Sequence, residues 1–124
     1  MGDLAEVTKK RVLRLVEEWK GRLGLGGWET IVSFKAKEEI PDKMAEACIT
    51  GDRRVARIYI RWPHKNNEGE DDNIEQCVVH ELVHCWFDPF FPTNPTRNKA
   101  RVRLVENAVD AIATALVQAK HECS

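Results

Sequence analysis

The strongest chemical signal in this 124-residue sequence is the run His80-Glu81-Leu82-Val83-His84. Residues four apart on an α-helix lie one turn above each other on the same face, so the two imidazoles can bind one metal ion. Glu81 is displaced by about 100 degrees around the helix axis, and it therefore flanks such a metal instead of binding it. The spacing predicts a zinc site held by His80 and His84, with Glu81 as the base that takes a proton from water.

A catalytic zinc site needs a third protein ligand, and Glu106 is the main candidate. On the predicted last helix it lies beside Val102 and Val109, on an apolar face where an unpaired carboxylate would be costly. Asp110, one turn later, is placed to accept a hydrogen bond from the second nitrogen of a ligand histidine. The alternatives are a surface ion pair between Glu106 and Arg103, and an Asp110 side chain that is simply solvated.

Other interpretations of the same helix stay open. Two core histidines satisfied by hydrogen bonds are the simpler alternative to a metal site. Cys77 lies one turn before His80, so Cys77, His80 and His84 could instead form a structural metal site, and a small buried thiol is the competing interpretation of Cys77. All four cysteines are irregularly spaced in a chain with an adequate core, and we expect them to be mostly reduced and mostly buried.

The periodicity of apolar residues predicts three helices. The first covers residues 4–23 and stops at Gly24. The helix that carries the two histidines opens with a capping box at Asp72 and runs to about residue 86 or 87. The last helix opens at Asn94-Pro95 and runs to about residue 120.

Alternation at the strand period predicts a strand over residues 30–36 and a hairpin with arms 45–50 and 55–62. The order is helix, strand, hairpin, helix, helix. It predicts an α+β fold with an N-terminal helix, a small three-stranded sheet, the site helix and a C-terminal helix. The length fits a single domain over residues 1–124.

The composition excludes several classes of protein. Charged residues make up 31% and hydrophobic residues 43% of the sequence, which is the balance of a soluble globular protein. The net charge of -1 disfavours binding to nucleic acid or to an acidic membrane surface. The N-terminus lacks the features of a signal peptide and no stretch is apolar enough to span a bilayer, so we expect a cytoplasmic protein.

The HELVH run, followed on the next predicted helix by Glu106 and, four residues later, Asp110, resembles the gluzincin clan of zinc metallopeptidases. The predicted helix and strands resemble the upper subdomain of zincins, so the likeness covers nearly the whole chain in a minimal form. It implies zinc ligands at His80, His84 and Glu106, a catalytic Glu81, and Asp110 as a hydrogen-bond acceptor for a ligand histidine. The activity it implies is hydrolysis of peptide bonds in a peptide or protein substrate.

The resemblance also implies a substrate-binding edge on the last strand before the site helix, at Val55, Arg57 and Tyr59. Larger gluzincins use a His or Tyr from a lower subdomain to stabilise the oxyanion, and no segment here matches one. The candidate substitutes are Tyr59, His64, His121, Arg101 and Arg103. Two alternatives to a peptidase remain, a zinc-stabilised binding module without catalysis and an inactive zincin scaffold.

Overall fold

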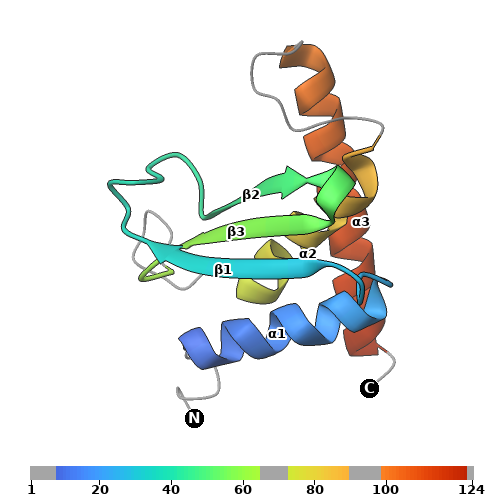
Figure 1. Ribbon diagram of the computed structural model, residues 1–124. Coiled ribbons are helices and arrows are strands. Elements are labelled where there is room, and N and C mark those ends of the chain that lie inside the picture. Colours follow the sequence, from blue (N-terminus) through green and yellow to red (C-terminus); the bar gives the residue numbers. More distant parts are fainter. Residues whose placement is uncertain (1–7, 65–72, 90–98, 123–124) are drawn as a thin grey trace.

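The computed structural model describes residues 8–64, 73–89 and 99–122, which contain three α-helices and three strands. The helices are α1 (Lys9–Arg22), α2 (Ile74–Phe87) and α3 (Lys99–Glu122). The strands are β1 (Glu29–Lys35), β2 (Ala45–Thr50) and β3 (Val55–Arg61), with a 3-10 turn, Gly51–Arg53, before β3. Helix α2 packs against α1, α3, β2 and β3, and Figure 1 shows it lying behind the sheet. The predicted α+β class with a small three-stranded sheet is confirmed.

Helix α1 begins later than the sequence pattern predicted. Thr8 has extended backbone angles and its side chain accepts a hydrogen bond from the amide of Arg11 at 3.1 Å, which makes Thr8 the N-cap. Helix α1 therefore begins at Lys9, and the predicted start at residue 4 lies outside the described residues. The stop is confirmed at Leu23 and Gly24, where a φ of 72° suits glycine. The buried face of the helix contains Val12, Leu15, Val16 and Trp19.

The sheet has the strand order β1-β3-β2, with β1 parallel and β2 antiparallel to β3. The predicted hairpin of β2 and β3 is confirmed. Side chains alternate along β3, so that Ala56, Ile58 and Ile60 are fully buried in the core while Arg57 and Tyr59 occupy the opposite face. Gly51 lies against the side chain of Asp88 at the end of α2, where an added Cβ would collide with the carboxylate.

The predicted substrate-binding edge at Val55, Arg57 and Tyr59 is wrong. These residues belong to β3, whose backbone pairs with β1 on one side and with β2 on the other. A strand that is hydrogen-bonded along both sides offers no row of free amides and carbonyls to an added peptide. The edges of this sheet are β1 and β2, and β2 is the edge in contact with α2.

Helices α2 and α3 supply the other half of the core. The N-cap of α2 is Asn73, whose side chain accepts a hydrogen bond from the amide of Gln76 at 3.1 Å. The predicted starts at Asp72 and at Asn94-Pro95 lie outside the described residues. Val109, Ala113 and Val117 form the buried stripe of α3. None of the helices in the described residues has the length and the apolar character needed to cross a membrane.

A buried carboxylate joins all three helices. Glu75 of α2, which is 5% exposed, accepts hydrogen bonds from the indole of Trp19 in α1 at 2.8 Å and from Lys120 and His121 in α3. Burial alone would raise the pKa of Glu75, but these hydrogen bonds outweigh it and lower the pKa from 4.5 to about 2. Lys120 also forms an ion pair with Glu18 of α1 at 3.0 Å. The cluster therefore fixes how α3 lies on α2 and α1.

We expect Glu75 to make the protein sensitive to acid. Its folded-state pKa lies below its unfolded value, so its stabilisation is present above pH 4.5 and is lost as the pH falls toward about 2. Glu75→Gln should lower the free energy of unfolding at neutral pH by about 2 kcal/mol, below the roughly 3–5 kcal/mol of a fully buried pair because His121 is largely exposed. The substitution should also make the free energy of unfolding depend less on pH between neutral and acid conditions.

Urea denaturation at neutral and at acid pH measures both effects. Glu38→Gln, at an exposed glutamate before β2, is the matched control and should behave like the parent protein. Equal stability of Glu75→Gln and the parent at neutral pH would contradict the assignment of this cluster.

Candidate metal centre

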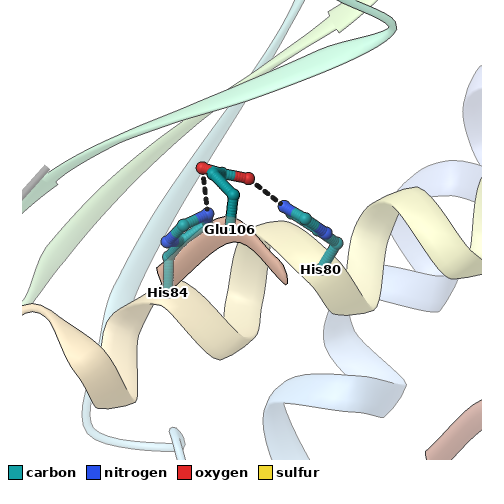
Figure 2. A group of neighbouring side chains, drawn as sticks. All are labelled: His80, His84 and Glu106. Carbon is teal, nitrogen blue, oxygen red and sulfur yellow. Dashed lines mark hydrogen bonds and ion pairs between the residues drawn. The ribbon is translucent and has the colours of Figure 1, made fainter. Parts of the chain in front are cut away.

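The residues that the sequence singled out as ligands converge in space. His80 and His84 project from α2 toward Glu106 of α3, as Figure 2 shows. The Nε2 atom of His80 lies 2.8 Å from Oε2 of Glu106, and Nε2 of His84 lies 3.0 Å from Oε1. One ligand atom from each of the three residues lies within 4.8 Å of the other two. Glu106 faces the histidines, as the metal-ligand interpretation predicts.

The spacing of these atoms fits a metal ion of the size of zinc. Ligand atoms at about 2.0–2.1 Å from a tetrahedral ion lie about 3.3 Å from one another. The two nitrogen–oxygen contacts of 2.8 and 3.0 Å are direct hydrogen bonds that would lengthen by a few tenths of an ångström around an ion, while ligand atoms up to 4.8 Å apart would move closer together. Two imidazole nitrogens and one carboxylate oxygen are donors that zinc accepts. The site can therefore hold a metal ion.

Glu106 is within hydrogen-bond distance of both histidines. A hydrogen bond from each Nε2 to Glu106 requires a proton on that nitrogen. Burial acts to lower the pKa of His80, but the Glu106 hydrogen bond and the nearby carboxylates outweigh it and raise the pKa. The same two hydrogen bonds hold the pKa of Glu106 well below its usual range. A metal ion would replace these protons with a fixed positive charge.

The second ring nitrogens of the two histidines have different surroundings. Nδ1 of His80 lies 3.4 Å from Oδ1 of Asp110, one turn beyond Glu106 on α3. This is the position that the sequence predicted for a carboxylate orienting a ligand histidine. Nδ1 of His84 is buried and has no hydrogen-bond partner among the described residues. A proton on Nδ1 of His80 therefore has a hydrogen-bond acceptor nearby, whereas a proton on Nδ1 of His84 has none among the described residues.

Glu81 lies beside the triad without joining it. Its side chain is 7% exposed and lines the same cavity as His80, His84 and Glu106. Burial raises the pKa of Glu81, and the charges of the two histidines oppose that rise. A carboxylate with a raised pKa accepts a proton more readily, which is what a general base near neutral pH requires.

The cavity over the triad has a volume of about 560 Å³ and three walls. Residues 43–47, which lead into and form the first half of β2, make one wall, while α2 and the N-terminal half of α3 make the others. The sequence pattern showed residues 45–50 as one arm of a hairpin but did not assign them to the site. They reach it because β2 is the strand that lies at the sheet edge beside α2.

Among the described residues, no thiol belongs to the triad. Cys77 lines the cavity, but it does not belong to the group formed by His80, His84 and Glu106. The predicted alternative of a Cys77-His80-His84 site is therefore not the arrangement found. Cys85 points into the core, and its burial raises the pKa of the thiol to about 12. Of the other two cysteines, Cys48 is exposed and Cys123 lies outside the described residues.

Comparisons of the chain with family models, with curated proteins and with solved structures found no match. The resemblance to gluzincins therefore still rests on the motif residues that carry it. What the structure adds is a His80-His84-Glu106 cluster that could bind a metal ion.

We expect zinc to stabilise the fold by joining α2 to α3. A ligand present at 100 times its dissociation constant raises the free energy of unfolding by about 2.7 kcal/mol. Glu106→Ala should weaken zinc binding by more than about 100-fold, because it removes a ligand and not merely a residue that supports one. Isothermal titration calorimetry and thermal unfolding with and without zinc measure the two effects.

The control for Glu106→Ala is Glu122→Ala, at an exposed glutamate on the same helix, which should leave zinc affinity unchanged. Zinc affinity in Glu106→Ala equal to that of the parent would eliminate Glu106 as a ligand.

Asp110→Asn tests the carboxylate next to His80. We expect a fall in zinc affinity of about 10- to 100-fold with one zinc still bound at saturation, because the ring would lose a charged acceptor without losing a ligand. Asp52→Asn, at an exposed position in the hairpin turn, should bind zinc like the parent. Complete loss of the metal in Asp110→Asn would instead make Asp110 a direct ligand.

Proposed function

We propose that the protein is a zinc-dependent hydrolase that cleaves peptide bonds. The observation that carries the proposal is the meeting of three ligand residues, His80, His84 and Glu106, with the buried Glu81 in one cavity. Structural zinc sites use four protein ligands, whereas catalytic sites use three and leave a position open. Three ligands among the described residues, together with an adjacent base, favour the catalytic type. We also propose that the fold is zincin-like.

The chain would divide the chemistry among four residues. When bound, zinc supplies a positive charge that polarises the scissile carbonyl and lowers the pKa of a water molecule. His80, His84 and Glu106 hold the ion. Glu81 takes a proton from the attacking water and later gives it to the nitrogen of the leaving amine. The burial that raises the pKa of Glu81 suits both steps, because the same carboxylate must accept a proton and then release it.

The edge strand β2 favours an extended peptide as substrate. Residues 43–47 border the cavity, and within the described part of the chain β2 pairs with β3 on one side only. A free strand edge can form backbone hydrogen bonds with an added strand of any sequence. A peptide bound along β2 would pass over the triad. This edge takes the place of the β3 residues that the resemblance implied.

Glu81→Gln tests the catalytic proposal. Glutamine keeps the shape of the side chain but cannot accept the proton, so zinc content should stay at one per chain while cleavage falls by about 100- to 10,000-fold. The measurements are metal analysis and the digestion of a peptide library followed by mass spectrometry. Glu17→Gln, at an exposed position on α1, is the matched control and should cleave like the parent.

The parent protein decides between the proposal and its alternatives. If the protein carries one zinc per chain and cleaves no peptide of the library at any pH tested, the proposal fails. A zinc-stabilised binding module or an inactive scaffold would then describe the protein.

A further inference from the structure

The proposed hydrolase lacks an assigned group for the negative charge that develops on the carbonyl oxygen of the substrate. In acyl transfer, stabilisation of this oxygen usually makes a large contribution to the rate enhancement. Five candidates follow from the sequence, and none of them is among the described residues that line the cavity. They are Tyr59, His64, His121, Arg101 and Arg103.

The positions of two of these candidates explain why they do not reach the cavity. Tyr59 lies on the face of β3 opposite to the buried side chains, and its ring packs under the ammonium of Lys35 at 5.5 Å. His121 donates a hydrogen bond to Glu75 at 2.7 Å in the cluster that joins the helices. Both side chains are engaged away from the triad.

We propose that Lys43 supplies the positive charge that stabilises the carbonyl oxygen of the substrate during hydrolysis. Among the described residues that line the cavity, Lys43 is the one lysine, and no arginine is present. It lies two residues before β2, on the wall along which a peptide substrate would bind. The inference rests on the proposed function and adds a catalytic residue to it.

The backbone on both sides of Lys43 is held in place by Arg61. This arginine, 5% exposed at the end of β3, donates from its guanidinium to the carbonyl of Pro41 at 3.3 Å and to the sulfur of Met44 at 2.7 Å. Its backbone amide also donates to the carbonyl of Met44 at 2.9 Å. The main chain at Lys43 is therefore anchored, while its side chain remains long and adaptable.

The Lys43 ammonium is available to a substrate. Its side chain is 61% exposed, and the ion pair it forms with Glu46 is long, at 4.0 Å, and lies at the surface. Such pairs contribute little and break readily.

The proposed step needs no co-reactant besides water. As the water oxygen bonds to the carbonyl carbon, Glu81 receives a proton from that water, and an electron pair moves to the carbonyl oxygen. Lys43 donates a hydrogen bond to this negatively charged oxygen and keeps its own proton. The electron pair then returns to form the new carboxyl group, the carbon–nitrogen bond breaks, and Glu81 passes its proton to the leaving nitrogen.

Lys43→Met, Lys43→Arg and the control Lys37→Met separate this role from a structural one. Lys37 is exposed in the same connection between β1 and β2 but does not line the cavity. A preorganised oxyanion donor is worth about 100- to 1,000-fold in kcat, and for the exposed Lys43 we expect about 10- to 100-fold. In Lys43→Met, kcat should fall by that factor with little change in KM or in zinc affinity. Lys43→Arg should retain most of the activity, and Lys37→Met all of it.

A second measurement does not depend on turnover. A phosphinic tripeptide, in which a tetrahedral phosphinate replaces the scissile amide, presents the same negative oxygen to the zinc-loaded protein. Its affinity, measured by calorimetry, should fall by about 10- to 100-fold in Lys43→Met and should persist in Lys43→Arg.

The two measurements distinguish failure of this inference from failure of the proposed function. If the parent binds the phosphinate but cleaves no peptide, the proposed function fails, and the phosphinate affinity of Lys43→Met still decides the role of Lys43. Equal phosphinate affinity in Lys43→Met and the parent overturns the inference. So does a zinc-loaded parent that does not bind the phosphinate.

Discussion

The antiparallel packing of α3 on α2 is the interaction on which the rest of the structure depends. Three sets of contacts fix its register. Glu75 pairs with Lys120 at one end, Gln76 donates to the hydroxyl of Thr114 at 2.9 Å, and the two histidines meet Glu106 at the other end. Between these polar contacts the apolar stripe of α3 is buried in the core. A helix seated with a one-residue error would turn its carboxylates by about 100 degrees, away from the histidines.

The same packing offsets the cost of burying charge on α2. Six of the 14 side chains of this helix are apolar and buried, yet it also carries two carboxylates and two imidazoles. An unpaired buried charge costs several kcal/mol, and the partners that reduce this cost come from α1 and α3. Glu75 and the histidines are compensated in this way. Glu81 is compensated least, and its raised pKa is the consequence that suits it to proton transfer.

The sheet gives the site its open side. Because β3 is paired along both edges, the strand that faces the cavity is β2, and the chain that leads into β2 is held by the buried Arg61. The cavity therefore has a strand edge, a triad and one lysine on neighbouring walls. These features are far apart in the sequence, and the short hairpin turn and the long connections bring them to one place. In the proposed hydrolase, the sheet edge orients the substrate, while α2 and α3 carry the metal ligands and the catalytic base.

The sequence by itself determined the helix of His80, Glu81 and His84 and the side of the last helix on which Glu106 lies together with Val109, because helical periodicity is local. It also determined the hairpin, whose arms are joined by a short turn. Only the tertiary structure decided that β1 adds to the second edge of β3, that Glu75 joins three helices and that Lys43 lines the cavity. Periodicity shows that a face or an edge must be covered, but the partner that covers it comes from distant parts of the chain and is chosen by packing.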